Sequence, residues 1–448
     1  MFCCATVIGG IAFILFFIGI LAKKRKSSRL QARVNTLKDK ANSWEDNEIE
    51  DFDPKNVLKE TDFNIMTERL KNRIIIPNLE EPDNSPYGTP ATYVNHVADH
   101  LVNAFDFSQV LNVLCQFKHF KTKIGDINLH FIHIVGSEEK RSTPIILLHG
   151  WPSTVWEFHK SIPKLVEQGY TVVAPSLPGH GFTDPPNVTG VSPSVMACAY
   201  HKLMHKLGYK RFVIHGGDWG AIIGSLLTYM YPESVIGLHN TMNHMNFGWR
   251  QILQSLIGAV LPSLVYTTEQ EKKFIHPMFK FGERMYRSFA YFHIQSVLPD
   301  SYGYGMVDSP VGLIGWIGTT YAIASSGRDS TVNMMTNLRN GLKNFGLDNA
   351  CANISLFWCV KSAQASMRIY YEFYWNDLEL LRNFSIPNVP VAISNFPNEI
   401  IHLTKFASKT TFNNIKQYNY HKHGGHFAHI DNTDGVVGDL TSFIQKLK

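Results

Sequence analysis

The amino-acid sequence predicts an α/β fold, in which a doubly wound, largely parallel sheet carries helices on both faces. Short apolar runs bounded by turn residues recur along the chain, helical stretches separate them, and one long segment without such runs precedes the last two. Parallel strands need crossover connections of this kind, so the rhythm indicates βαβ units. The 448 residues, 44% of them hydrophobic, are enough for a core of this size with additions to it.

The chain begins with an apolar segment, residues 2–22, that carries no charged side chain. A helix of that length rises about 30 Å, which matches the hydrocarbon thickness of a bilayer. A cleaved signal peptide is the alternative, but such peptides carry positive charge before a shorter apolar core, whereas here the cations follow the segment. We therefore expect a single transmembrane helix at 2–22, with Met1 outside the cytosol and the rest of the chain inside it.

The formal net charge of +5 comes from one cluster directly after this segment. Its members are Lys23, Lys24, Arg25, Lys26 and Arg29, and the remaining 37 basic residues balance 37 acidic ones. A nucleic-acid surface needs a basic stripe on the folded domain, and the sequence has none. Residues 23–50 are polar and charged, and we interpret them as a tether with some helical content.

The six cysteines do not have the spacing of a metal site. Cys3 and Cys4 lie in the predicted anchor, either as small apolar residues at a helix end or as sites of palmitoylation. The others are expected to be free thiols, because cytosolic proteins are kept reduced. They are Cys115, Cys198, Cys351 and Cys359.

Residues 51–118 contain two stretches with apolar residues at helical spacing, and a turn-rich segment, "PNLEEPDNSPYGTP", separates them. The stretches are "NVLKETDFNIMTERLKN" and "ATYVNHVADHLVNAFDFSQVLNVL". They predict an N-terminal helical subdomain. Two alternating runs then flank Gly125 and Asp126, which predicts a β-hairpin.

The core of the fold is predicted in two parts, residues 119–242 and 386–448. The first contains the hairpin and the strands in "PIILLHG", "TVVAPSL", "RFVIHGG" and "SVIGLHN". The second contains "VPVAIS", "NIKQYNY" and a closing helix, "GVVGDLTSFIQKLK". Residues 243–385 have aromatic-rich helical patterns and no comparable strand, so we interpret them as a cap inserted into the α/β domain.

The strand "RFVIH" leads into Gly216, Gly217, Asp218, Trp219 and Gly220, and then into a helix. In a nucleophile elbow the turn is so sharp that small residues must flank the nucleophile, and its side chain stands above the carboxyl edge of the sheet. Asp218 is therefore the candidate nucleophile. Taken alone, the turn is equally consistent with Asp218 as the N-cap of the following helix.

A second loop, "LLHGWP", ends an earlier strand and contains His149, Gly150, Trp151 and Pro152. It resembles the oxyanion loop of α/β-hydrolases, in which backbone N–H groups bind the negative charge that develops beside the nucleophile. The predicted donors are the amides of Trp151 and Trp219. An ordinary Gly-Pro turn explains this loop less well, because the elbow follows it at the right spacing.

The segment "HKHGGHFAHID" contains four histidines. His426 lies in a tight Gly-Gly-His-Phe loop after the last strand, where the catalytic base of such a fold belongs. A metal cluster is the alternative, but the spacing matches no zinc motif and no acid or cysteine pair completes it. We interpret the other three as strand or surface residues: His421, His423 and His429.

The acid of a catalytic triad should lie between elbow and base in chain order. The strand and loop "VPVAISNFPNE" end in Glu399, which is suited to hold His426 in the correct tautomer. Asp377 is the substitute candidate. Asp431 and Asp434 follow the histidine and fit this order poorly.

Together these motifs resemble the microsomal epoxide hydrolase family, which includes juvenile hormone epoxide hydrolases and has the α/β-hydrolase fold. The resemblance covers nearly all of residues 50–448. It is carried by "HFKTKIGDINLHFIHI", "LLHGWPSTVWEFHKSIPKL", "APSLPGHGF", "HGGDWG", "FHIQSVLPDSYGYGMVDSPVGL", "FPNE" and "HGGHF". The elbow alone would not separate this family from haloalkane dehalogenases.

The resemblance implies two cap tyrosines that donate hydrogen bonds to an epoxide oxygen. The matching positions are Tyr291, in "SFAYFHIQ", and Tyr370, in "SMRIYYEF", where Tyr371 is adjacent. It further implies hydrolysis of an epoxide to a vicinal diol through an ester on Asp218, without metal or organic cofactor, at the endoplasmic reticulum membrane. The alternatives are a haloalkane dehalogenase and a catalytically inactive, membrane-anchored binding protein on the same fold.

The predicted cap is rich in large apolar side chains, which indicates a hydrophobic substrate pocket. The residues concerned are Phe289, Phe292, Trp316, Phe357 and Trp358. A membrane anchor also suits lipophilic epoxides that partition into the bilayer. Epoxides of xenobiotics, fatty acids and terpenoid hormones all fit this description.

Overall fold

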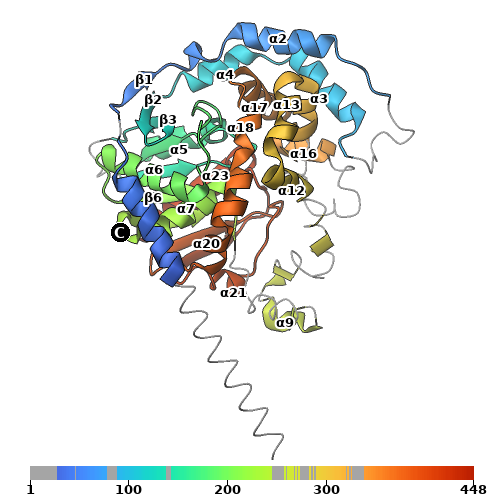
Figure 1. Cartoon of the computed structure of the whole chain (residues 1–448). Helices are drawn as coiled ribbons and strands as arrows, with labels where there is room; N and C mark the ends of the chain where they lie inside the picture. The colour runs from blue at the N-terminus through green and yellow to red at the C-terminus, as the bar shows by residue number, and fades with distance from the viewer. Residues whose placement is uncertain are drawn as a thin grey trace, which may run out of the picture. The chain divides into compact units, whose positions relative to one another are not determined.

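A computed structural model describes residues 28–45, 47–77, 88–137, 143–244, 289–318 and 338–448, together with 320, 321, 324 and scattered positions between 257 and 286 (Figure 1). The chain divides into two compact units, Met1–Trp44 and Glu45–Lys448. The described part of the first unit contains a helix over 28–42. The predicted anchor, residues 2–22, lies outside the described residues, and no described helix is long and apolar enough to cross a membrane.

In the described part of the second unit, nine strands form one sheet in the order β1-β2-β3-β5-β4-β6-β7-β8-β9. Pairing is antiparallel from β1 through β3 to β5 and parallel from β5 to β9. The bounds are β1 Glu50–Phe52, β2 His119–Ile124, β3 Ile127–Ile134, β4 Pro144–Leu148, β5 Thr171–Pro175, β6 Phe212–Gly216, β7 Val235–Asn240, β8 Val391–Asn395 and β9 Ile415–Tyr420. The predicted α/β fold and hairpin are confirmed, and every predicted core strand is present.

Helices cover both faces of this sheet, as two neighbouring residues of β7 show. A Cβ at Gly237 would meet Phe443 of α23 (Thr433–Gln445), whereas Leu238 lies against Gly224 of α7 (Asp218–Met230). Successive side chains of a strand point to opposite faces, so α7 and α23 lie on opposite sides of the sheet. The helix α6 (Pro193–Lys206) packs beside α7, and α5 (Ser161–Glu167) packs beside α23.

The region predicted as an N-terminal helical subdomain begins with a strand instead. The strand β1 adds to the sheet edge beside β2, which the sequence did not indicate because the segment is only three residues long. Helices follow it: η1 Pro54–Asn56, α2 Glu60–Lys71, α3 Ala91–Asn103 and α4 Phe107–Leu114. In α3 the buried residues Tyr93, Val97 and Leu101 recur every four positions, so they form one apolar face.

Between β7 and β8 the described residues form helices and no strand, as predicted for the cap. The elements are α9 Pro262–Val265, α12 Ala290–Val297, α13 Pro299–Asp308, α14 Pro310–Leu313, η4 Ile314–Gly318, α16 Leu338–Phe345, α17 Leu347–Cys359, α18 Ala363–Ser366, α19 Arg368–Glu372, η6 Phe373–Asp377 and α20 Leu378–Asn383. Arg368 pairs with Asp300 through two hydrogen bonds of 2.9 Å and joins α19 to α13. Tyr93 of α3 donates a 2.6 Å hydrogen bond to the Gly318 carbonyl, so the N-terminal helices support the cap.

Candidate active site

The predicted elbow joins β6 to α7, and Asp218 stands at the turn with a φ of 47°. A positive φ is uncommon for a residue other than glycine, so the surrounding structure must hold this conformation. Two glycines make the turn possible. A Cβ at Gly216 would clash with the backbone of Gly220, and a Cβ at Gly220 would clash with the carbonyl of Leu148 in β4.

The structure also decides between the two interpretations of Asp218. Gly217, not Asp218, is the N-cap of α7, and no side chain makes a capping hydrogen bond there. The carboxylate of Asp218 instead lies where His426 and the loop after β4 meet. The helix-cap interpretation is therefore wrong, because the side chain is committed to contacts above the sheet edge.

His426 connects the candidate nucleophile to the candidate acid. Its Nε2 lies 3.1 Å from Oδ2 of Asp218, and its Nδ1 lies 2.8 Å from Oε1 of Glu399. Glu399 is fixed in turn, because Oε1 accepts the backbone N–H groups of Ile400 at 2.7 Å and Ile401 at 3.2 Å. The structure thus brings together three predicted residues from the loops after β6, β8 and β9.

The two carboxylates control the protonation of His426. Burial alone lowers the pKa of this imidazole, but the charges and hydrogen bonds of Glu399 and Asp218 raise it well above its usual value. With both carboxylates ionised, the ring is an imidazolium. Loss of the negative charge on Asp218 would remove one of the two groups that hold this proton.

The loop after β4 places a donor on the other oxygen of Asp218. The backbone N–H of Trp151 donates to Oδ1 at 2.8 Å. His149 fixes this loop: its Nε2 accepts the N–H of Leu177 at 3.0 Å, and its Nδ1 lies 3.0 Å from the Gly150 carbonyl. Because Nε2 accepts, Nδ1 carries the proton, and burial lowers the pKa of His149 to about 4, which keeps the ring neutral.

The second predicted oxyanion donor is the N–H of Trp219. This residue is the second of α7, and the first N–H groups of a helix have no carbonyl partner within it. No carbonyl within the helix therefore competes for this amide, which directly follows Asp218 in the chain. The carbonyl of Pro152, in the loop after β4, accepts a hydrogen bond from the hydroxyl of Tyr321, which helps to fix this loop.

Both predicted tyrosines face Asp218 from the cap. The ring centroids of Tyr291 in α12 and Tyr370 in α19 lie 5.9 Å apart, and Tyr370 packs edge-on against Trp219 at 4.7 Å. Burial and the charge of Asp218 raise the pKa of both phenols, so both keep their protons at neutral pH. The adjacent Tyr371 is 41% exposed and does not line the cavity.

The cavity above Asp218 is almost entirely apolar apart from these candidate catalytic groups. It is lined by Asp218, Trp219, Ile222, Met242, Phe289, Tyr291, Phe292, Tyr370, Ile400, Ile401 and His426. Phe289 and Phe292 lie where the sequence predicted. Trp316, Phe357 and Trp358 do not line this cavity, which corrects the predicted pocket.

The two tryptophans that lie outside the cavity contact other helices instead. The indole N–H of Trp316 donates to Gln295, and that of Trp358 donates to the carbonyl of Asp62 in α2. Both residues therefore join helices to one another. Ile400 and Ile401 were missed by the sequence analysis, although the loop that positions Glu399 necessarily carries its next residues to the same place.

The other candidate acids have different partners. Asp377 accepts hydrogen bonds of 2.7 Å from the backbone N–H and the hydroxyl of Ser194, at the start of α6. Asp434 forms an exposed ion pair with Lys164. The carboxylate oxygens of Asp431 are buried, and this burial raises the pKa of Asp431 to about 7. Among the candidate acids, Glu399 is the one whose carboxylate lies against His426, as the order of residues in the chain predicted.

The four cysteines outside the predicted anchor are free thiols, as expected. Within the described part of the chain, no group of three or more His, Cys, Asp and Glu residues is arranged to hold a metal ion. His429 is not a strand or surface residue, because it lies in the helix over 428–431 and belongs to a buried hydrogen-bonded chain that the sequence analysis did not find. His421 directly follows β9, and its Nε2 lies 2.8 Å from the carboxylate of Asp439.

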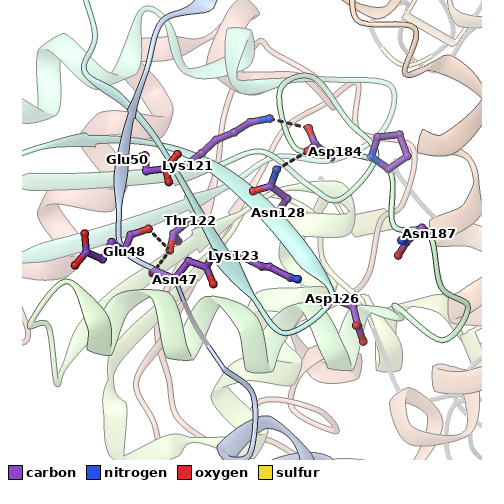
Figure 2. Close-up of a pocket in the computed structure, with 11 residues that line it drawn as sticks. Asn47, Glu48, Glu50, Lys121, Thr122, Lys123, Asp126, Asn128, Asp184 and Asn187 are labelled. Atoms are coloured by element: carbon purple, nitrogen blue, oxygen red, sulfur yellow. Dashed lines mark hydrogen bonds and ion pairs between the residues drawn. The ribbon is translucent and has the colours of Figure 1, made fainter.

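A separate polar groove of about 490 Å³ lies over β1, β2 and β3 (Figure 2). Figure 2 shows Lys121 and Asn128 directed toward Asp184, and Lys121 forms a 2.7 Å ion pair with it. Thr122 donates a 2.8 Å hydrogen bond to the Asn47 carbonyl. These groups bind one another, and none of the candidate catalytic residues lines the groove.

Two family models match the chain. The model described as "Epoxide hydrolase N terminus" matches residues 53–158, and the model described as "alpha/beta hydrolase fold" matches residues 143–276. The two matches together cover the N-terminal helices, the oxyanion loop and the elbow.

Curated relatives and a solved structure agree with this result. The chain is 32% identical to the juvenile hormone epoxide hydrolase of Manduca sexta, with 86% of this chain and 83% of the relative covered. It is 29% identical to epoxide hydrolase 1 of Sus scrofa, with 90% of each covered. The crystal structure of juvenile hormone epoxide hydrolase from the silkworm Bombyx mori matches with a TM-score of 0.81 at 27% identity, over 89% of this chain and 95% of that one.

Proposed function

Because this chain belongs to the epoxide hydrolase family, we propose that it opens lipophilic epoxides through a covalent ester on Asp218 and then hydrolyses that ester to release a vicinal diol. One observation carries the proposal: the Asp218 carboxylate lies between an acid–base partner on one side and two protonated phenols on the other. The following steps assign a chemical role to each of these groups.

In the first half-reaction, Oδ2 of Asp218 attacks an epoxide carbon and the ring C–O bond breaks. The Trp151 N–H holds Oδ1 at 2.8 Å, and Oδ2, which lies 3.1 Å from the His426 ring, is the attacking oxygen. Tyr291 and Tyr370 donate hydrogen bonds to the oxygen that leaves the carbon, and this stabilises its developing charge. A phenol gives the proton that completes the alcohol, and it recovers one as the His426 imidazolium releases its proton.

Formation of the ester switches His426 from an acid to a base. Ester formation neutralises Asp218, one of the two carboxylates that raise the pKa of this imidazole. The neutral ring, oriented by Glu399, then removes a proton from a water molecule. The hydroxide attacks the ester carbonyl, whose oxygen accepts hydrogen bonds from the Trp151 and Trp219 amides.

Collapse of the tetrahedral intermediate regenerates the enzyme. The bond from the Asp218 carbonyl carbon to the diol oxygen breaks, and His426 gives its proton to that oxygen. The carboxylic acid of Asp218, which now carries one oxygen from water, returns its proton to His426. The net reaction consumes one epoxide and one water and leaves both residues in their starting states.

The cavity favours a lipophilic epoxide. Phe289, Phe292, Ile222 and Met242 give its walls hydrocarbon surface, and charged groups are limited to the reacting residues. A panel of arene, fatty-acid and terpenoid epoxides, assayed with purified enzyme, would rank these substrate classes. A preference for small charged epoxides would contradict this part of the proposal.

We also propose that residues 2–22 anchor the enzyme in the endoplasmic reticulum membrane, with the catalytic unit in the cytosol. The charge-free segment and the five cations from Lys23 to Arg29 support this topology. Carbonate-resistant membrane association of the full chain, lost on deletion of 2–22, is the expected result. Unchanged membrane association after the deletion would contradict the anchor.

The covalent step is tested by trapping. His426→Gln should form the ester but hydrolyse it slowly, so the intact enzyme gains the mass of one substrate, and Asp218→Asn should gain none. In ¹⁸O-water, a single turnover should place unlabelled carboxylate oxygen in the diol. Labelled diol in the first turnover would show that water, not Asp218, attacks the epoxide.

A haloalkane dehalogenase is the alternative with similar machinery. The tyrosine pair favours the epoxide, because a leaving alkoxide needs proton donors whereas halide needs none. Halide release from chloroalkanes, measured beside diol formation, distinguishes the two activities. An inactive binding protein would show neither activity and would not form an ester.

A further inference from the structure

Apart from Asp218, His426 and Glu399, a set of buried residues forms one continuous hydrogen-bonded chain across the sheet. From end to end it consists of Ser161 in α5, His429 in α22 (Ala428–Asp431), His215 in β6, His239 in β7, Ser394 in β8 and Asp439 in α23. Ile214 packs against α7, so the next residue, His215, points to the opposite face. The hydrogen-bonded chain therefore runs on the face of the sheet that α23 covers, beneath the loops that carry the candidate catalytic residues.

Asp439 determines the direction of every bond in this chain. Burial raises the pKa of this carboxyl, but hydrogen bonds from His421, Ser394 and Asn419 lower it overall, so the group is ionised and can only accept. The Nε2 of His421 lies 2.8 Å from it, and Asn419 donates at 2.6 Å. The hydroxyl of Ser394 therefore donates its hydrogen bond to Asp439.

The donor of each remaining hydrogen bond follows from the bond between Ser394 and Asp439. Since the Ser394 oxygen can now only accept, Nε2–H of His239 donates to it at 2.8 Å. The bare Nδ1 of His239 accepts Nδ1–H of His215 at 2.8 Å, and Nε2 of His215 accepts Nε2–H of His429. The Nδ1 of His429 then accepts the hydroxyl of Ser161 at 2.7 Å.

This assignment leaves every ring nitrogen paired and every ring uncharged. Burial lowers the pKa of His239 to about 4 and that of His429 to about 3, and it holds that of His215 well below its usual value. A proton added to any of the three rings would turn an acceptor into a donor that faces another donor. The chain is therefore a rigid, directional connection between neutral groups.

Each triad residue is a short distance along the backbone from a member of this chain. His429 lies on α22, directly after the loop of the base, and His215 lies at the end of the strand that enters the elbow. The pairs are His215 with Asp218, Ser394 with Glu399, and His429 with His426.

We infer that this histidine chain positions the base for ester hydrolysis, with the bond from His429 to His215 setting the approach of His426 to Asp218. The inference rests on the proposed covalent mechanism. The two half-reactions depend on this approach unequally. Attack on the epoxide needs Asp218 and the tyrosines, whereas hydrolysis needs His426 to hold a water against the ester carbonyl, and small misplacements of such groups slow a reaction strongly.

His215→Leu tests this role, because it removes both bonds of the central ring while it keeps the site apolar. Slower hydrolysis with unchanged alkylation lowers kcat and KM together, since the ester accumulates. We expect kcat to fall about tenfold, KM to fall with it, and kcat/KM to stay within about twofold. His215→Gln, which keeps an acceptor for His429, should recover both constants toward the wild-type values.

His244→Leu is the matched control. This histidine is also buried, close after β7, but no hydrogen bond to its ring is found among the described residues. Its replacement should leave kcat and KM unchanged. A merely structural defect in His215→Leu would lower the amount of active enzyme, and therefore kcat and kcat/KM, with KM unchanged. That pattern would overturn the inference.

Two further measurements apply if His215→Leu does not fold. Ser161→Ala removes only the first donor and should lower kcat and KM together by a smaller factor. Histidine-selective ¹⁵N NMR of the wild-type protein at neutral pH should show Nδ1–H in His215 and Nε2–H in His239 and His429. Reversed tautomers or an imidazolium would contradict the assigned hydrogen-bond donors and overturn the inference. Failure of His426→Gln to trap an ester would instead contradict the proposed mechanism itself.

Discussion

The backbone N–H of Trp151 donates to Oδ1 of Asp218 at 2.8 Å, so the loop after β4 holds the carboxylate of the candidate nucleophile. The same oxygen becomes the ester carbonyl and then the oxyanion in the proposed reaction. The donor therefore needs no rearrangement between the two half-reactions, which is the advantage of a preorganised site. The close approach of loop and nucleophile is possible because Gly150, the residue before the donor, has no side chain.

Gly150→Ala should nearly abolish turnover. A Cβ at this position would clash with the carboxylate and the Cβ of Asp218, so either the loop or the nucleophile must move. Loss of an oxyanion donor costs on the order of 10²-fold or more in kcat, and misplacement of the nucleophile adds to it. Steady-state kinetics and the rate of ester formation measure the effect.

Gly438→Ala is the control for the glycine replacement. This glycine lies within α23, and a Cβ there would meet no atom within 4 Å. Alanine is the better helix former by about 1 kcal/mol, so the control should be as stable as the wild type or more stable, with full activity. Equal activity of the two variants would contradict the assigned contact between Gly150 and Asp218.

Tyr291→Phe and Tyr370→Phe should each slow alkylation of Asp218 and leave ester hydrolysis nearly unchanged. Each variant removes one proton donor to the epoxide oxygen, and such general-acid contributions are on the order of 10²-fold. Rapid-mixing measurements on a single turnover separate the two rates. Tyr371→Phe is the matched control, because that ring is exposed and lies outside the cavity.

The sequence predicted Asp218 and His426 as site residues because both lie in short local patterns. The glycines around Asp218 and the loop of His426 are contiguous in the chain, and the chain order then pointed to Glu399. Trp316 and Trp358 were assigned to the substrate pocket wrongly. An apolar residue of a helical cap packs against the substrate or against another helix, and only the three-dimensional arrangement decides which.

The histidine chain could not be predicted for a related reason. His215 and His239 lie in different strands and become neighbours only through the register of β6 with β7. Their donors and acceptors depend further on Asp439, far along the sequence. A buried histidine in a strand gives no local signal of such a partner, whereas the glycines of an elbow do.

His244→Leu should make the protein less sensitive to acid. Burial lowers the pKa of His244 to about 4 in the folded protein, whereas the unfolded chain takes up the proton near the usual value of about 6.5. The wild type therefore loses stability as the pH falls from about 6.5 toward 4, and the variant lacks this contribution. The difference in free energy of unfolding should change by about 1.4 kcal/mol per pH unit in this window, and urea titrations at pH 7, 6 and 5 measure it.

Glu157→Gln should show the opposite pH dependence. Burial raises the pKa of this carboxyl from 4.5 to about 7, although a hydrogen bond from Ser153 and the charge of His426 oppose the shift. Between these values the folded protein keeps a proton that the unfolded chain releases, so the wild type loses stability as the pH rises through the window. Glutamine is neutral throughout, and the variant should gain up to about 3 kcal/mol over the wild type between pH 4.5 and 7.5.

Denaturant titrations across this pH range, with Glu167→Gln as an exposed control on α5, measure the difference. The control should follow the wild type at every pH. A constant offset between Glu157→Gln and the wild type would mean that Glu157 is ionised in the folded protein. In that case a third carboxylate would act on His426, and its imidazolium would be held more tightly than Glu399 and Asp218 alone hold it, so the ester would be hydrolysed only at higher pH.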